Sequence, residues 1–293
     1  MNKKKSLVLF QYSYWDLIPV IAGFMHFAYL IFILLSFHHI PLWQSVLLGL
    51  IYAFSISWNI NGISHNFIHN AYFKSYFLNR IFSLVESITM CFSQTMYDYV
   101  HRQHHIGNND YLNEYGDTID WISIYRHGKH GRPEQPLKYS FLSFFRDDPI
   151  KIYRLIQKHS KSLAYISIIE LGLSLLFIVG LFLYDGWLAL YFLIFYYLGH
   201  SLTAMNGYYE HYKANPLKPI AWGVSCYNSV FNFIWFNNGY HAEHHYRPKQ
   251  HWTKMKELHE QIKDEQKKAG VHVIRFPHQF GFLQYFDKEF QND

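Results

Sequence analysis

Three clusters of histidines carry the clearest chemical signature in this sequence. His101-Arg-Gln-His-His105 and His241-Ala-Glu-His-His245 share one pattern: a histidine, two other residues and a histidine pair. The third cluster, His65-Asn-Phe-Ile-His69, has two histidines four residues apart. On an α-helix, positions i, i+3 and i+4 share one face, so each cluster is expected to aim its imidazoles at one point. Such convergence is typical of metal ligands. The predicted ligands are His65, His69, His101, His104, His105, His241, His244 and His245.

The elements that hold these clusters are expected to lie in a membrane. Half of the chain is apolar and 20% of it is Phe, Trp or Tyr. After Lys3, Lys4 and Lys5 there is no Lys or Arg until Lys74, and a second such gap covers residues 162–212. Long stretches without basic residues, flanked by basic segments, indicate membrane-crossing regions whose positive flanks face the cytoplasm. Nucleic-acid binding is excluded because no clustered basic face is present.

Four transmembrane helices are predicted, at about 17–37, 41–60, 163–185 and 187–206. The first of these stretches has no formal charge and is long enough to cross a hydrocarbon core of ~30 Å at ~1.5 Å per residue. Short turns join the helices into two hairpins. The predicted fold is therefore an all-α integral membrane protein with a cytoplasmic helical cap that carries the histidine clusters, formed by residues 1–293 as a single domain. Both termini are expected to be cytoplasmic.

Three more segments with charged side chains are expected outside the four spans. Residues 76–92 include charged side chains and indicate an interfacial or partly inserted helix. Residues 148–161 form a basic amphipathic segment. Residues 252–270 indicate a charged amphipathic helix with Gly270 as its C-cap.

The form and order of the clusters resemble the membrane fatty acid desaturase and hydroxylase superfamily. Flanking residues agree with this: Phe73-Lys-Ser-Tyr-Phe-Leu-Asn79, Asn108-Asn-Asp110, and His245-Tyr-Arg-Pro248 with Trp252. The resemblance covers most of the chain. It implies two iron ions that are held by histidines and use O2 to break an unactivated C–H bond. The ligand set alone does not name the metal, since imidazole also suits zinc, which can replace iron after overexpression.

The resemblance also implies a ninth histidine ahead of the third cluster, and two residues compete for this place. His211 lies just past the fourth predicted span, at the depth expected for the clusters. His200 is roughly 16 Å deeper if the helix is continuous. We expect His211 to be the ligand.

Outer hydrogen-bond partners are expected near the clusters, because ligating histidines normally donate their second N–H to an acceptor. Asp98 precedes His101 by three residues, while Asn61 and Asn237 each precede a cluster histidine by four. All three could instead be caps or loop hydrogen bonders.

Three ionisable residues, His26, Glu170 and His200, fall inside predicted spans, where such residues are functional candidates. Packing near the interface or against a neighbouring helix is the alternative for His26 and Glu170. Neither residue is assigned a role. Cys91 and Cys226 have no metal-binding spacing and are also left without one.

The function expected from the resemblance is desaturation of a fatty acyl chain with O2. A lipid, alkane or carotenoid hydroxylase or ketolase of the same superfamily is the alternative, and Gly207-Tyr-Tyr-Glu-His-Tyr212 resembles the N-Y-x-E-H-Y motif of alkane hydroxylases. A membrane metal transporter is the alternative from another class. It should place ligands along a transmembrane pathway, whereas these clusters gather at helix ends.

Electrons must come from a separate partner. The sequence has no His-Pro-Gly-Gly haem motif, no G-x-G-x-x-G and no cysteine set for an iron–sulfur cluster. A ferredoxin, a rubredoxin or a cytochrome b5 type of protein could supply electrons. Lys249, Lys254 and Lys256 beside the third cluster could dock such an acidic donor. The other expected partners are the lipid bilayer and a long-chain acyl substrate.

Overall fold

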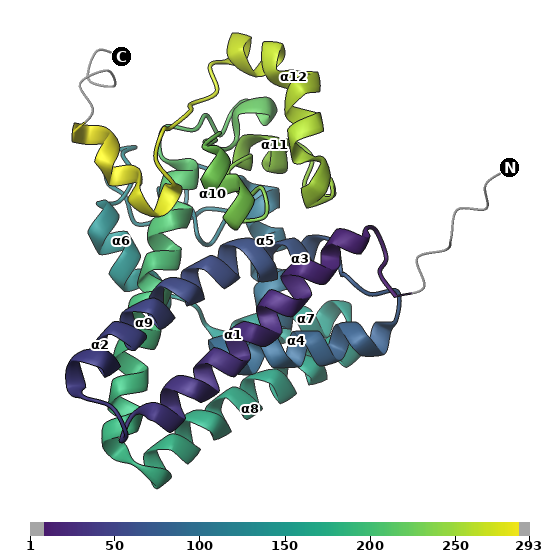
Figure 1. Ribbon diagram of the computed structural model, residues 1–293. Helices are drawn as coiled ribbons and strands as arrows, with labels where there is room; N and C mark the ends of the chain where they lie inside the picture. The colour runs from purple at the N-terminus through teal and green to yellow at the C-terminus, as the bar shows by residue number, and fades with distance from the viewer. Residues whose placement is uncertain (1–8, 287–293) are drawn as a thin grey trace, which may run out of the picture.

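The structure, a computed structural model, describes residues 9–286, and helices dominate this range (Figure 1). Within it, β-pairing is limited to isolated bridges such as that between Phe10 and Phe73. The predicted all-α class is confirmed. Lys3, Lys4, Lys5 and both chain ends lie outside the described residues.

Four helices are long and apolar enough to cross a membrane, as predicted. They are Tyr14–Ser36, which includes α1 (Leu17–Ser36); Leu42–His69, which begins with α2 (Leu42–Trp58); α8 (Lys161–Tyr184); and α9 (Gly186–His211). The second and fourth run past their predicted ends at residues 60 and 206. These extensions carry His65, His69 and His211 beyond the apolar part of each helix.

The turns that join these helices meet at one end of the bundle. His38, between α1 and α2, contacts Asp185, between α8 and α9. Helices α2 and α9 pack side by side and both run away from this end (Figure 1). The rise from Leu42 to His65 and from Gly186 to His211 is roughly 35 Å in each case. The two helices therefore deliver their histidines to a similar height. The cytoplasmic orientation of that end stays a prediction.

Two glycines allow the close approach of α2 and α9. A Cβ at Gly199 would lie 2.8 Å from the carbonyl oxygen of Ala53, and a Cβ at Gly49 would lie 2.3 Å from the ring of Phe195. Small residues at such crossings let helix backbones pack tightly in membrane proteins. The buried side chains around them, including Tyr52 and Phe192, form the largest apolar cluster of the bundle.

Shorter helices surround one side of the bundle. They are α4 (Tyr76–Met90), α5 (Gln94–Gly107), α6 (Pro136–Leu142) and α7 (Pro149–His159). Helix α4 packs against α1 and α8, α7 packs against α5 and α8, and α6 packs against α9. A helix was expected at 76–92, and the structure has one there; the basic amphipathic segment expected at 148–161 forms α7. Their depth in the membrane stays a prediction.

The last third of the chain covers the histidine end of the bundle, opposite the two turns (Figure 1). It contains α10 (Ser229–Ile234), α11 (His241–Tyr246) and α12 (Met255–Ala269). Gly270 follows α12 with a φ of 75°. This left-handed conformation confirms the predicted C-cap.

Candidate metal centre

A π-helix precedes the first histidine cluster. Helix α2 continues through η2 (Asn59–Ser64) into α3 (His65–His69) without a break. The wider π turn lets an extra residue bulge, so the cluster faces a direction that a regular α-helix would not give it. His26 supports this segment, because its Nδ1 accepts a hydrogen bond from the Asn59 amide at 2.9 Å. Ser55 pairs with the other ring nitrogen at 2.9 Å. His26 therefore has a structural partner on each side.

Glu170 fixes the helix that carries the second cluster. Its carboxylate is buried in α8 and accepts hydrogen bonds from the Ser83 hydroxyl (2.6 Å), the Ser93 hydroxyl (2.7 Å) and the Thr95 backbone N–H (2.9 Å). Ser93 is the N-cap of α5. A carboxylate at a helix N-terminus also interacts favourably with the helix dipole. The buried Glu170 thus holds the start of α5, and the cluster lies at its other end.

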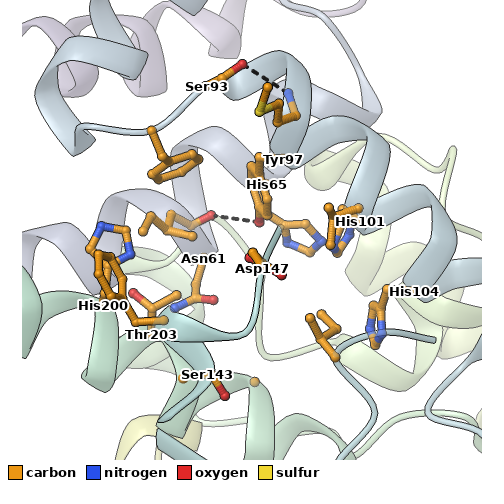
Figure 2. Close-up of a pocket in the computed structure, with 18 of the residues that line it drawn as sticks. Asn61, His65, Ser93, Tyr97, His101, His104, Ser143, Asp147, His200 and Thr203 are labelled. Carbon is orange, nitrogen blue, oxygen red and sulfur yellow. Dashed lines mark hydrogen bonds between the residues drawn. The ribbon is translucent and has the colours of Figure 1, made fainter. Parts of the chain in front are cut away.

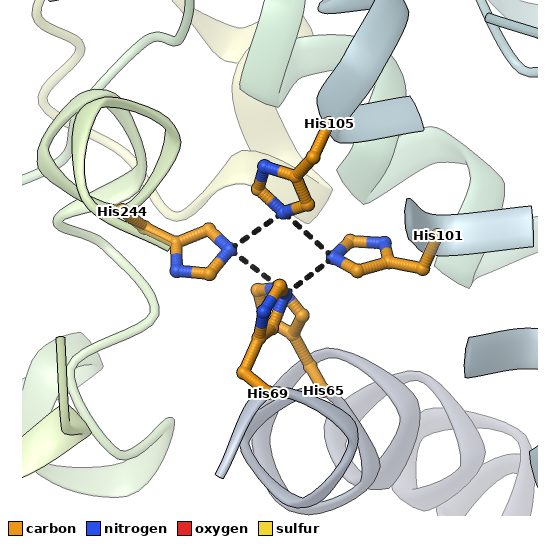
Figure 3. Close-up of side chains that lie close together, drawn as sticks. All are labelled: His65, His69, His101, His105 and His244. Atoms are coloured by element: carbon orange, nitrogen blue, oxygen red, sulfur yellow. Dashed lines mark hydrogen bonds between the residues drawn. The ribbon is translucent and has the colours of Figure 1, made fainter. Parts of the chain in front are cut away.

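Nine histidines converge into two groups at the histidine end of the bundle. Within each group, the nearest ligand atoms all lie within 4.8 Å of one another. The group of five is His65, His69, His101, His105 and His244, which Figure 3 shows with their ring nitrogens facing inward. The group of four is His104, His211, His241 and His245. These are the nine residues that the sequence singled out, with His211 included and His200 outside both groups.

Each three-histidine cluster splits between the groups, which corrects the expectation that a cluster aims at one point. His104 belongs to the group of four, while His101 and His105 belong to the group of five. At ~3.6 residues per turn, position i+4 is rotated about +40° from position i, and position i+3 about −60°. The side chains at i+3 and i+4 therefore lie on opposite sides of the side chain at position i. For this reason the histidines of one cluster can belong to two neighbouring groups.

In the group of five, the Nε2 atoms form a chain of short contacts. His69 and His101 are 2.8 Å apart at Nε2, and His101 and His105 are 3.0 Å apart. His244 lies 3.0 Å from both His105 and His65. The group of four is similar: His104 Nε2 lies 3.0 Å from that of His211 and 3.2 Å from that of His245, and His211 lies 3.2 Å from His241.

In four of these histidines the Nδ1 atom points outward to an oxygen atom. The contacts are His104 to Asp120 Oδ2 (2.7 Å), His245 to Asn108 Oδ1 (2.8 Å), His211 to the Trp222 carbonyl (3.1 Å) and His65 to Asn238 Oδ1 (3.1 Å). An oxygen acceptor at Nδ1 fixes the proton there and leaves the Nε2 lone pair bare. Bare lone pairs about 3 Å apart repel one another unless a cation lies between them.

These distances suit metal ligation. Ring nitrogens bound at ~2.0–2.1 Å to one ion and at right angles to each other lie about 3 Å apart. Burial holds the pKa values of His101, His105, His241, His244 and His245 well below their usual range. These imidazoles are therefore neutral at pH 7, which is the form that binds metal. Both groups are compatible with metal binding.

Two buried carboxylates lie beside the group of four. Asp120 is fully buried and accepts hydrogen bonds from His104 and from the Asn109 backbone N–H (2.9 Å). Glu210 Oε1 lies 3.6 Å from His241 Nδ1 and accepts a hydrogen bond from the Asn238 amide at 2.7 Å. Because imidazoles are neutral, these carboxylates supply negative charge close to a bound cation. The sequence reasoning missed both.

The three residues expected to support the histidines have other partners. The carboxylate of Asp98 binds the Arg102 guanidinium at 2.7 and 3.1 Å. The amide of Asn61 donates to the Ser57 carbonyl at 2.8 Å, and that of Asn237 donates to the Trp252 carbonyl at 3.0 Å.

The expected spacing fails for physical reasons. Asn61 lies in the π-helix, where four residues no longer correspond to one turn. Asn237 lies in a turn between α10 and α11 with a φ of 62°, so it shares no helix with His241. The neighbouring Asn238 contacts a different histidine, His65 of the first cluster. Asn108 could have been predicted as an acceptor, because it lies in the motif Asn108-Asn-Asp110. Asp120 and the Trp222 carbonyl lie in loops, and their spacing from the histidines follows no pattern that would predict the contact.

A cavity of about 370 Å³ leads to both groups (Figure 2). One face of α5 and one face of α9 line its length, with residues at helical spacing. They are Ser93, Met96, Tyr97, Val100, His101 and His104 on α5, and His200, Thr203, Ala204, Gly207 and His211 on α9. His200 lies at the side away from His101 and His104 (Figure 2). Its Nε2 lies 3.3 Å from the Met90 carbonyl, and aromatic rings surround it.

The family described as Fatty acid desaturase matches residues 41–277, which include all nine histidines and both carboxylates. No curated protein and no solved structure matches the chain. The match covers most of the sequence, and the four apolar helices agree with an enzyme family of the membrane. The chain therefore belongs to the fatty acid desaturase family.

Proposed function

We propose that this protein is an integral membrane di-iron oxidoreductase that uses O2 and external electrons to desaturate a fatty acyl chain. The observation that carries the proposal is the convergence of nine buried or half-buried imidazoles into two groups with bare Nε2 atoms facing inward. Two irons held there would supply the oxidising power to remove hydrogen from an unactivated C–H bond.

The two groups differ in ways that bear on access. The group of four has one imidazole fewer, and its members His104, His211 and His241 line the cavity. At Gly207, one turn before His211, a Cβ would meet no atom within 4 Å, so space is open beside the ligands. Catalytic metal sites keep a position free of protein ligands. Small molecules can approach this group from the cavity, which His65 and His101 of the group of five also line.

The cavity suits an extended hydrocarbon chain. It follows α5 and α9 from the histidines to His200, eleven residues before His211, which corresponds to roughly 16 Å. An extended chain advances about 1.2 Å per bond, so roughly 13 bonds fit this length. Apolar side chains such as Met96, Val100 and Ile152 line it. A chain restrained in this way presents the same few methylenes to the metals in each turnover.

Hydroxylation is the second candidate, and the sequence Gly207-Tyr-Tyr-Glu-His-Tyr212 favours it because of its resemblance to alkane hydroxylases. Both reactions begin with removal of one hydrogen. Loss of a second hydrogen gives an alkene, whereas return of oxygen gives an alcohol. The four candidate spans among the described residues and the second cluster of the form H-x2-HH favour desaturation. A transporter is disfavoured because both histidine groups lie at one end of the bundle.

The proposal includes a cytoplasmic orientation and a separate electron donor. Lys249, Lys254 and Lys256 are exposed beside the third cluster. Such a basic surface would steer an acidic ferredoxin, rubredoxin or cytochrome b5 type of protein towards the histidine end.

One experiment tests metal and reaction together. The full chain is expressed in a host of known lipid composition under iron-replete conditions, and its lipids are analysed by mass spectrometry. We expect products two hydrogens lighter, with an internal double bond, and about two metal ions per purified chain. Products that mainly gain one oxygen would move the assignment to a hydroxylase. Less than about one metal ion per folded chain would overturn the di-iron site, with zinc counted as a substitute for iron.

A further inference from the structure

The cavity that leads to the histidines opens at the protein surface between α6 and α7. Most of its lining is buried or half-buried, but Phe144, Asp147 and Pro149 line it and are also exposed. Phe144 lies in the short helix η3 (Ser143–Phe145), directly after α6, and Pro149 begins α7. A substrate can therefore reach the cavity past residues 143–149.

The surface around this opening carries many large apolar side chains beside the exposed charged residues Lys138, Asp147 and Asp148. Large apolar side chains of α6, η3 and α7 are exposed there: Leu137 (54%), Phe141 (43%), Leu142 (40%), Phe145 (68%) and Ile150 (64%). A contiguous exposed apolar patch on a protein marks a contact with a membrane or with a partner.

This patch adjoins a helix that is expected to lie in lipid. The Phe144 ring packs against the rings of Tyr196 (5.7 Å), Tyr197 (5.7 Å) and His200 (5.3 Å). The Tyr197 hydroxyl donates a hydrogen bond to the Phe141 carbonyl at 2.6 Å. All three partners of Phe144 belong to the apolar part of α9, a candidate membrane span. The opening therefore adjoins the surface of a candidate membrane span.

The charges at the opening are unsuited to an anionic carrier. Among the described residues that line the cavity there is no Lys or Arg, and the charged ones are Asp147 and Glu210. Arg146 is bound by both oxygens of buried Glu134, at 2.7 and 2.8 Å. The exposed Lys138 ammonium lies 3.5 Å from the same Glu134 carboxylate. The Lys151 ammonium lies 4.6 Å from the centre of the Trp121 ring. Carriers with phosphate groups need exposed cations at the site that recognises them.

We propose that the substrate is an acyl chain of a membrane lipid, which reaches the cavity sideways from the bilayer through the surface formed by residues 137–150, here called the lateral portal. An acyl thioester on a soluble, anionic carrier is the alternative substrate class. The proposal rests on the proposed function for the chemistry, but it concerns only where the chain comes from.

The first test compares substrates. Membranes that contain the full chain and the host's electron donors receive a deuterated acyl chain as phosphatidylcholine in the bilayer or as a coenzyme A thioester. We expect the labelled phospholipid to be converted while the chain is still in the phospholipid, and the thioester to be converted only after its label has entered lipid. Conversion of the thioester before any label reaches phospholipid would overturn the portal.

The second test does not depend on turnover. Phosphatidylcholine with a photoreactive diazirine in its acyl chain is incorporated into the same membranes, and the adducts are mapped by peptide mass spectrometry. We expect adducts on residues 137–150. Phe145→Glu places a charge at the portal and should lower these adducts at least about tenfold, because ionised side chains are costly against lipid. Unchanged adducts in this variant, or none in the natural chain, would overturn the proposal.

Phe233→Glu is the matched control, since Phe233 is another exposed phenylalanine (84%) and lies on α10, away from the portal. It should leave the portal adducts unchanged. Equal metal content in both variants shows that the fold is intact. Alcohol products together with portal adducts would contradict desaturation but support the portal. Alkene products that form first on the thioester would support desaturation but contradict the portal.

Discussion

At the scale of single residues, the hydrogen bonds on the outer side of the histidines decide which ring nitrogen is free to bind metal. Asp120 is the strongest case, because a buried carboxylate accepts the Nδ1 proton of His104 at 2.7 Å. The Asn109 backbone N–H donates a hydrogen bond to the same oxygen. Such partners orient a ligand and increase its basicity. A histidine without this support could turn or change tautomer, and the bare Nε2 would be lost.

Replacing Asp120 with Asn should therefore weaken the metal site while the fold persists. The amide removes the negative charge but keeps an oxygen acceptor, and losses of about 10–100-fold in metal affinity or activity are typical for such partners. Iron titration of the purified protein and product analysis measure the effect. Asp117→Asn is the control, since Asp117 is largely exposed and pairs with Arg126. Equal losses in the two variants would contradict the role of Asp120.

The two candidates for the ninth ligand make a second prediction at this scale. His211→Ala should abolish turnover and lower the metal content, because its Nε2 lies 3.0 Å from that of His104. His200→Ala should keep the metal, since its ring contacts the Met90 carbonyl and aromatic side chains instead. Metal analysis of both purified variants separates the two. Full metal content in His211→Ala together with loss of metal in His200→Ala would reverse the assignment.

At the scale of elements, Glu170 illustrates how one buried charge places a whole helix. Glu170→Leu leaves the Ser93 hydroxyl and the Thr95 N–H without an acceptor, and each buried unsatisfied group costs about 1–3 kcal/mol. We expect a lower unfolding temperature and a lower metal content, because α5 carries three of the histidines. Glu170→Gln keeps one oxygen acceptor and should recover part of both. If the Glu170→Leu variant had the same unfolding temperature and the same metal content as the natural chain, Glu170 would not anchor α5.

The helices could be predicted from the sequence more accurately than the side-chain contacts at the site. Hydrophobic stretches and charge gaps were enough to find four long helices, since a membrane allows few other solutions for so apolar a chain. Helical spacing also identified the eight histidines of the three clusters, and the family resemblance pointed to His211. The spacing could not reveal that His104 and His105 belong to different groups, because that depends on how α5, α9 and α11 meet. The contact between Asp120 and His104 spans a loop, and the contact of His211 uses a backbone carbonyl, which has no sequence signature.

At the scale of the whole molecule, the two turns that meet through His38 and Asp185 define one end of the bundle, and the histidines define the other. If the histidine end is cytoplasmic, reporter tags at Met1 and Asp293 should both report the cytoplasm, and a tag at Asp185 should report the opposite side. A cytoplasmic signal at Asp185 would contradict the hairpin arrangement.

Metal binding should also stabilise the entire molecule, because the histidines join parts of the chain that are far apart in sequence. The groups take ligands from α3, α5, α9 and α11, so the unfolded chain cannot present them together. A ligand present at about 1,000 times its dissociation constant stabilises the folded state by roughly 4 kcal/mol. For a chain of this size we expect removal of the metal to lower the unfolding temperature by at least about 5 °C. Thermal unfolding in detergent, before and after treatment with a chelator, measures the difference. His211→Ala removes a ligand from the group of four only, so it should lose part of this chelator-sensitive difference. A chelator effect of equal size in His211→Ala would show that metal bound by the group of four does not stabilise the fold.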